Sequence, residues 1–93
     1  MTGEPSWRRR HRIVWRYTTE GVVVLPVGGG EPVSLAGAAL AVWQSLRTPG
    51  TVEEVAGRLA AGVGASRDEV RDGVSRAIQA LASQSLVEED RRA

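Results

Sequence analysis

The sequence predicts one α+β domain in which three strands are followed by three helices. Up to residue 35, apolar side chains either alternate with polar ones or form short β-branched runs, as they do in strands. Beyond residue 35 they recur every three or four positions, as on one face of a helix. Strands grouped before helices are typical of the α+β class, and a chain of 93 residues suits a single domain.

The first two strands are expected before the glycine-rich segment. In residues 12–17, Ile13, Trp15 and Tyr17 alternate with Arg12, Val14 and Arg16, which predicts a half-buried strand with Trp15 in the core. Residues 18–21 predict a turn that ends in Gly. Residues 22–25 are all apolar and mostly β-branched, which predicts a central strand.

A third, short strand is expected at the edge of the sheet. A phosphate-binding loop would need a helix directly after the glycines of residues 28–30. Here Pro32 and the strand-like Val33–Leu35 follow, so we expect a hairpin turn instead. Because Pro32 has no N–H to donate, Val33–Leu35 is predicted to be an edge strand.

Three helices are expected after this strand. The first has its apolar face at Ala39, Leu40, Trp43 and Leu46, which places Trp43 in the core. The other two begin at capping boxes, Thr51–Glu54 and Ser66–Glu69, in which the hydroxyl and the carboxylate cap each other's backbone N–H groups. The last helix is the longest.

The chain is predicted to divide into a flexible basic arm (residues 1–11), a folded domain (residues 12–88) and a charged tail (residues 89–93). Charge runs such as Arg8 to Arg12 are usually solvated. Trp7 precedes the first strand and is expected to be exposed. The arm could solubilise the chain or touch nucleic acid, a membrane surface or an acidic peptide.

Charge is distributed unevenly along the chain. Residues 1–20 carry five Arg and two Glu, a net charge of +3, whereas residues 21–93 carry seven Arg and nine acidic residues, a net charge of −2. The folded body is therefore mildly acidic, unlike most nucleic-acid-binding domains.

The residue types argue against an enzyme. The chain has no Cys and one His, His11, which lies in the arginine run without partners for catalysis or metal binding. We therefore expect no catalytic residues, no metal and no cofactor. No apolar run approaches the ~18 residues of a membrane span, and the lack of Cys fits a cytoplasmic protein.

Several segments, in this order and spacing, carry a family resemblance. They are Val22-Val-Val-Leu25, Gly28-Gly-Gly30, Val33-Ser-Leu35, Ala36-Gly-Ala-Ala39, Thr51-Val-Glu-Glu-Val55 and Ser85-Leu-Val87. Over about residues 12–88 the chain resembles the PqqD-like proteins, which are RiPP recognition elements (RiPP, ribosomally synthesised and post-translationally modified peptide). The chain departs from the family at Ala36, where an Asn or Ser helix cap is common.

The resemblance implies a winged helix-turn-helix-like fold and a non-catalytic role. Such domains bind the leader region of a precursor peptide as an added strand, beside the third strand and against the third helix, and present it to a separate enzyme. Trp43 resembles the versions found in lasso-peptide biosynthesis, where that enzyme is a leader peptidase. A radical SAM maturase is the other possible partner.

The candidate site combines the predicted edge strand with one face of the last helix. At ~100° per residue, four side chains of that helix share a sector about 60° wide. The candidate leader-binding residues are Pro32, Val33, Ser34, Leu35, Arg67, Arg71, Val74 and Ile78. In this hypothesis the apolar pair holds apolar leader residues and the arginines meet acidic ones. The alternative is that the apolar pair is core and the arginines are solvated.

Two further functions stay open at this point. A winged-helix DNA-binding protein would share the same element order, because a fold does not fix a function. A generic interaction domain without a leader peptide is the third possibility. The mildly acidic body favours peptide binding.

Overall fold

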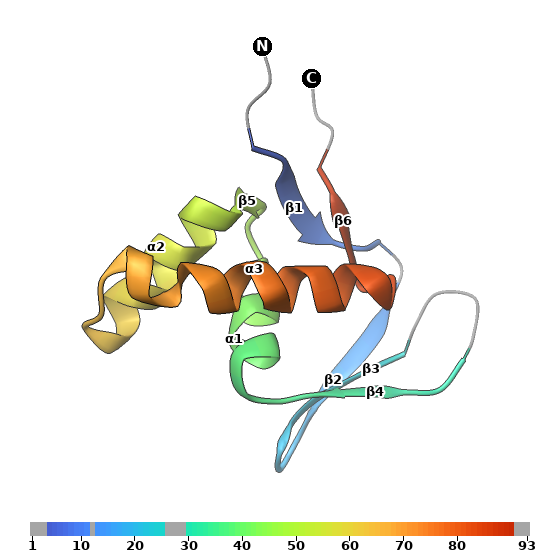
Figure 1. The fold of residues 1–93 in the computed structure, drawn as a ribbon. Helices are drawn as coiled ribbons and strands as arrows, with labels where there is room; N and C mark the ends of the chain where they lie inside the picture. The colour runs from blue at the N-terminus through green and yellow to red at the C-terminus, as the bar shows by residue number, and fades with distance from the viewer. Residues whose placement is uncertain (1–3, 12, 26–29, 91–93) are drawn as a thin grey trace.

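The computed structural model describes residues 4–11, 13–25 and 30–90 (Figure 1). It contains two small antiparallel sheets and three helices, so the predicted α+β class is confirmed. In chain order the elements are β1 (Ser6–Arg9), β2 (Val14–Thr18), β3 (Gly21–Leu25), β4 (Val33–Leu35), α1 (Gly37–Ser45), β5 (Gly50–Thr51), α2 (Val52–Val63), α3 (Arg67–Ser83) and β6 (Val87–Glu89).

The predicted sheet has the strand order β2-β3-β4. The expectations of a central β3 and an edge strand β4 are therefore confirmed. On β3, Val22 and Val24 face the core and are 1% and 0% exposed. Leu35 of β4 lies opposite Val22 and is also buried. The glycine turn expected at residues 28–30 lies outside the described residues except for Gly30.

The hairpin between β2 and β3 depends on Gly21. Its φ is +154°, which L side chains rarely adopt. The carbonyl oxygen of Leu35 also occupies the space that a Cβ at this position would need. A side chain here would therefore separate β4 from β3.

The second sheet, with strand order β5-β1-β6, was not predicted. The sequence predicts a solvated arm and tail, but Ser6–Arg9 forms β1 and Val87–Glu89 forms β6, and the two strands pair. Trp7 was expected to be exposed, but it is half-buried and packs against the core. Figure 1 shows β1 and β6 side by side at the end of the molecule where the chain enters and leaves.

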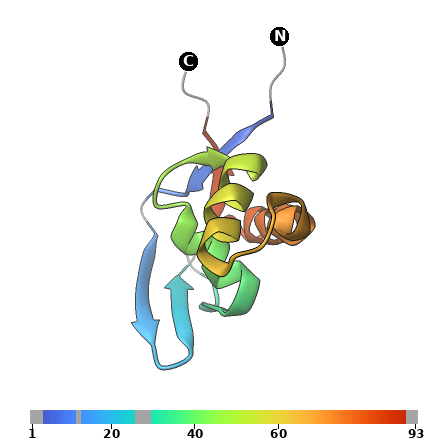
Figure 2. The same ribbon diagram turned by 90° about the vertical axis from the view of Figure 1, so that its left-hand side faces the viewer.

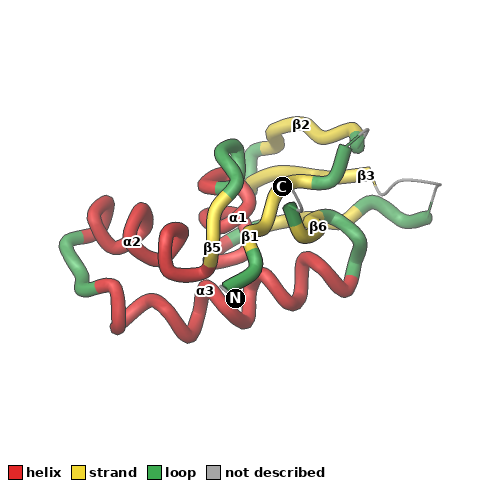
Figure 3. The backbone as a smooth tube through the Cα atoms, turned by 90° about the horizontal axis from the view of Figure 1, so that it is seen from above, coloured by secondary structure: helices red, strands yellow, loops and turns green. Residues whose placement is uncertain are grey.

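The core lies between the first sheet and the helices. Trp43 of α1 is fully buried, as predicted, and belongs to a cluster of apolar side chains from β3, β4, all three helices and β6. Figure 2 shows the helices packed together on one side, with the β2–β3 hairpin projecting on the other. Figure 3 shows α2 and α3 along one side and the strands toward the other.

Both predicted capping boxes are present. The Thr51 hydroxyl accepts from the backbone N–H of Glu54 at 3.1 Å, and the Glu54 carboxylate accepts from the N–H of Thr51 at 2.8 Å. Ser66 and Glu69 do the same at the start of α3. In each helix the cap fixes the first turn and orients the apolar face.

The role of Gly21 can be tested against a glycine that has free space around it. Gly21→Ala is expected to lower the free energy of unfolding by roughly 1–3 kcal/mol, because it adds both a strained φ and a clash with β4. Gly73 of α3 has nothing within 4 Å of its Cβ position, so Gly73→Ala should raise stability by about 0.5–1 kcal/mol. Urea unfolding of both variants measures the difference. Equal effects would contradict this explanation.

Candidate functional site

The outer edge of β4 is open. Within the described residues no strand pairs with β4 on the side away from β3. Ser34 is exposed in the middle of this strand, Val33 is half-buried and Leu35 is 4% exposed. Pro32, just before the strand, is exposed as well. These four predicted site residues form one continuous segment at the sheet edge.

The sheet register indicates which backbone groups face outward. Residues opposite each other in an antiparallel ladder alternate between hydrogen-bonded and non-bonded pairs. The two-residue turn makes Thr18 and Gly21 a bonded pair, so Val23 is expected to bond toward β2. Its partner on β4 is Ser34. We therefore expect the N–H and C=O of Ser34 to point away from β3, where an added strand could bind them.

The two apolar residues predicted on α3 lie in the core. Val74 is 3% exposed and Ile78 is 1% exposed. Both belong to the cluster around Trp43. This is the arrangement that the alternative interpretation foresaw, and their side chains offer no free surface to a peptide in this structure. Helical spacing had placed them on one face without showing what covers it.

The two predicted arginines of α3 meet at Glu53 of α2. Arg71 donates its Nε–H to a carboxylate oxygen of Glu53, and an Arg67 guanidinium nitrogen lies 3.8 Å from the other oxygen. The hydrogen bond and the charge of Glu53 both raise the pKa of Arg71. The arginine side chains are 59% (Arg67) and 50% (Arg71) exposed, so this is a solvated cluster.

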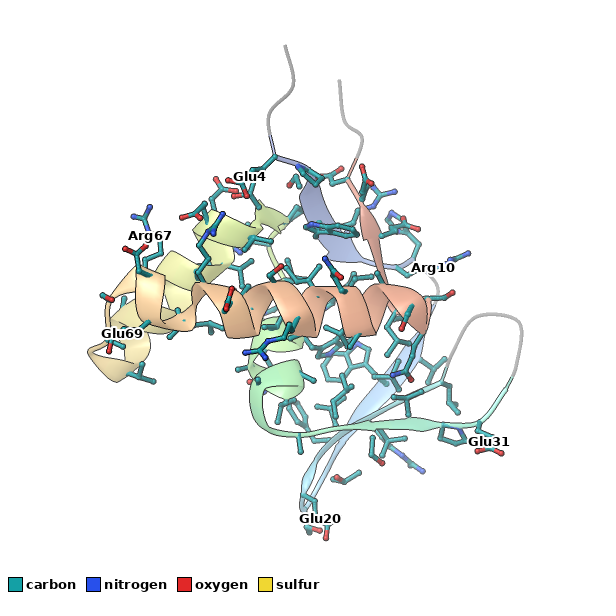
Figure 4. The ribbon with its side chains drawn as sticks, viewed as in Figure 1. Glu4, Arg10, Glu20, Glu31, Arg67 and Glu69 are labelled. Carbon is teal, nitrogen blue, oxygen red and sulfur yellow. The ribbon has the colours of Figure 1, made fainter. Side chains whose placement is uncertain are left out.

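The structure does not bring the arginines beside β4. In Figure 4, Arg67 lies at the α2 end of α3, whereas Glu31, just ahead of β4, lies at the opposite side of the view. The predicted site therefore splits into two surfaces. One is the sheet edge at Pro32–Leu35, and the other is the Arg67–Arg71–Glu53 cluster.

A cluster of three side chains, Arg9, Trp15 and Trp43, was not predicted from the sequence. The Arg9 Nε–H donates to the carbonyl oxygen of Trp43 at 2.9 Å. Its guanidinium carbon lies 4.4 Å from the ring centroid of Trp43 and 5.3 Å from that of Trp15. Burial, and next the charge of Arg47, lower the pKa of Arg9. A stack of an arginine on two tryptophans leaves no local pattern in the sequence.

Trp15 is not in the core, contrary to the prediction. It is 36% exposed, and its neighbour Tyr17 is 66% exposed. Trp15 packs edge-on against Tyr17 and against Trp43, at centroid distances of 5.4 and 6.4 Å. Because β2 is the other edge of the sheet, its inward-facing rings are only partly covered.

Nowhere in 4–11, 13–25 and 30–90 do three or more His, Cys, Asp or Glu side chains gather as they would to hold a metal ion. Among the helices of these ranges, none has the length and apolarity needed to cross a membrane.

The arrangement of sheets and helices is similar to that of one solved protein. This is the solution NMR structure of the PqqD truncation of Methylobacterium extorquens PqqCD, described as a functional and stand-alone RiPP recognition element. The TM-score is 0.70 at 19% sequence identity, over 89% of this chain and 88% of that chain. At this identity the likeness establishes a shared fold.

The family follows from the sequence itself. The family model for Coenzyme PQQ synthesis protein D (PqqD) matches residues 21–87, which is more than half of the chain. The chain therefore belongs to the PqqD family, as the resemblance had implied. A comparison with curated protein sequences finds no match.

The contribution of the Arg9 stack can be measured against its neighbour. Arg9→Ala is expected to lower the free energy of unfolding by about 2 kcal/mol, because it removes a partly desolvated cation–π contact and a hydrogen bond. Arg8→Ala is the matched control: it removes partly exposed ion pairs with Glu88 and, at 3.7 Å, with Asp90, and surface ion pairs of this kind are each worth under ~1 kcal/mol. Thermal and urea unfolding give both values. Similar decreases in the free energy of unfolding for the two variants would show that the stacking of Arg9 on the tryptophans does not stabilise the fold.

Proposed function

We propose that this chain binds the leader region of a RiPP precursor peptide without catalysing any reaction, and presents it to a separate processing enzyme. The observation that carries the proposal is the open outer edge of β4, with Ser34 exposed at its centre. Membership of the PqqD family supports it, as does the fold shared with a RiPP recognition element.

An extended leader would add to the sheet as a fourth strand beside β4. Main-chain hydrogen bonds to an exposed strand edge supply affinity with little choice of sequence. Specificity then has to come from side chains near the edge. Val33 is half-buried and offers a partial apolar contact, while Pro32 limits how far the ladder can extend in that direction.

The arginine cluster would select acidic leader residues at a distance from the edge. The 17 residues of α3 span about 25 Å, which an extended peptide covers with about eight residues at ~3.3 Å each. A leader that reaches both surfaces would continue beyond its β4-paired part and run along α3, with about eight residues needed to cover the full length of the helix. Its carboxylates would compete with Glu53 for Arg67 and Arg71.

We favour a leader peptidase of lasso-peptide biosynthesis as the enzyme partner, with a radical SAM maturase as the other candidate. The support for the lasso type is Trp43 in the middle of the first helix, which resembles the versions found in lasso-peptide biosynthesis. The absence of Cys from all 93 residues is compatible with a cytoplasmic site of action.

Winged-helix DNA binding is the weaker alternative. A duplex binder needs several arginines free to contact phosphates. In this chain Glu53 pairs with Arg67 and Arg71, and Glu88 pairs with Arg8 and lies 4.0 Å from Arg10. We expect only weak, strongly salt-dependent binding to DNA.

The edge-strand mode predicts a selective effect of proline. Ser34→Pro removes an N–H that is expected to face outward, so leader binding should weaken about tenfold or more while the β3–β4 ladder persists. The probe is a fluorescein-labelled synthetic RiPP leader peptide that the unmodified chain binds, and its affinity is measured by fluorescence polarisation. Ser34→Ala keeps the N–H and is the control. Circular dichroism verifies folding. Unchanged affinity in a folded Ser34→Pro variant would exclude this edge.

The arginine cluster predicts two changes of opposite sign. Arg71→Glu should weaken binding of a leader that carries acidic residues, whereas Glu53→Gln should tighten it, because the arginines lose their internal partner. Each change should be several-fold and should shrink at high salt. The same polarisation assay measures both variants. No effect of either substitution would remove Arg67 and Arg71 from the site.

A non-catalytic role predicts that the purified chain leaves its precursor intact. Mass spectrometry of the precursor after incubation with the chain alone should show no change of mass. A mass change that disappears when a residue of this chain is mutated would contradict the proposal.

A further inference from the structure

A pocket of about 370 Å³ lies between β1 and the end of α1. It is lined by β1 and the adjoining turn, by the end of α1 and the following loop, and by Asp90. Arg9, one of its lining residues, stacks on Trp15 of β2. Since the strand order is β2-β3-β4, this contact links the pocket to the sheet edge opposite the proposed leader edge.

The pocket carries positive charge that the described part of the chain does not neutralise. Arg8 pairs with Glu88 and lies 3.7 Å from Asp90. Arg9 and Arg47 also line the pocket, and no carboxylate of the described residues lies within 4.0 Å of either. The charge of Arg47 lowers the pKa of Arg9, which indicates that the two guanidinium groups repel each other. An added anion would relieve that repulsion.

Aromatic side chains adjoin this charge. Trp15 and Tyr17 lie edge-to-face on β2, and both are exposed. Arg9 is held in place by the two tryptophan rings and by the Trp43 carbonyl, so little side-chain entropy remains to be lost on binding. Tyr, Trp and Arg are the residue types that most often supply binding energy at protein interfaces.

We propose that this basic pocket binds an acidic segment of a second protein, with a carboxylate between Arg9 and Arg47 and an apolar neighbour against Trp15 and Tyr17. A carboxylate matches the planar donor groups of arginine. The apolar neighbour would cover rings that the fold leaves exposed.

The surroundings favour a short acidic segment over a long polyanion. Among the described residues that line the pocket, Arg9 and Arg47 are the two arginines without a carboxylate within 4.0 Å, whereas Asp90 forms part of the wall and Glu88 pairs with the adjacent Arg8. An extended nucleic acid needs a continuous basic stripe. The pocket is instead local and bordered by carboxylates.

The basic pocket is a different surface from the proposed leader edge. The proposed leader edge is β4, whereas the basic pocket is linked to the sheet through the contact of Arg9 with Trp15 of β2, on the far side of β3. One domain could then hold a peptide and a second protein at the same time. If the leader experiments failed, the proposal for the pocket would still stand. If the pocket experiments failed, the proposal for leader binding at β4 would still stand.

The experiment titrates the ¹⁵N-labelled full chain with acetyl-Leu-Glu-Leu-Glu-amide and, as control, with the corresponding Gln peptide. Two-dimensional amide spectra report every site separately. The expected result is that the Trp15 indole and the Arg47 amide signals shift with the Glu peptide only, while Ser34 does not shift. Shifts centred on Ser34, or equal shifts with the Gln peptide, would overturn the proposal.

Charge reversal supplies the second arm. Arg47→Glu should lower the affinity of the chain for the Glu peptide about tenfold, as expected for the loss of one charge-assisted hydrogen bond. Arg76→Glu changes the same charge at an exposed position of α3 outside the pocket and should alter affinity less than about twofold. Arg47→Gln serves if the Glu variant does not fold. Equal losses in both positions would overturn the proposal, as would a 12-base-pair DNA duplex that binds the pocket more tightly than the peptide.

Discussion

The fold depends on the seating of Arg9 between Trp43 and Trp15. Trp43 is the largest fully buried side chain, and Arg9 is bonded to its backbone and stacked on its ring. A buried Trp removes roughly 150–250 Å² from water. Because Arg9 belongs to β1, this contact fixes β1 against the C-terminal half of α1.

β1 is the central strand of the second sheet. It pairs on one side with β5, directly before α2, and on the other with β6, just after α3. The strand therefore holds the beginning of one helix and the end of another. Arg8 and Glu88, directly opposite in this sheet, add a cross-strand ion pair at 2.7 Å. Charge that appears solvated in the sequence is here part of a strand pairing.

The sequence was informative wherever the signal is local. Capping residues such as Thr51 and Ser66 act on N–H groups three positions away, and Pro32 restricts its own strand, so the helix starts and the edge of β4 could be predicted. The second sheet could not, because its pairing joins segments about eighty residues apart and β5 has only two residues. No periodic pattern accumulates over such short elements.

The same limit applies to the candidate site. Periodicity assigns a residue to a face but does not show what covers that face. Trp15 was expected to be buried because it shares one face of its strand with Ile13 and Tyr17. However, β2 lies at a sheet edge, where the rest of the structure covers Trp15 only in part. Val74 and Ile78 share a helical face with Arg71. In the structure Val74 and Ile78 are buried in the core, whereas Arg71 forms an ion pair with Glu53.

The pairing of β1 with β6 has a consequence for how this domain can be joined to others. Trp7 lies opposite Glu89, so the chain enters and leaves at neighbouring points (Figure 1). A short linker from residue 90 to residue 4 would close the backbone into a ring, and new ends could be opened in the exposed turn at Thr19 and Glu20. The domain is therefore suited to circular permutation and to insertion within a larger enzyme, with the β4 edge left clear of the junction.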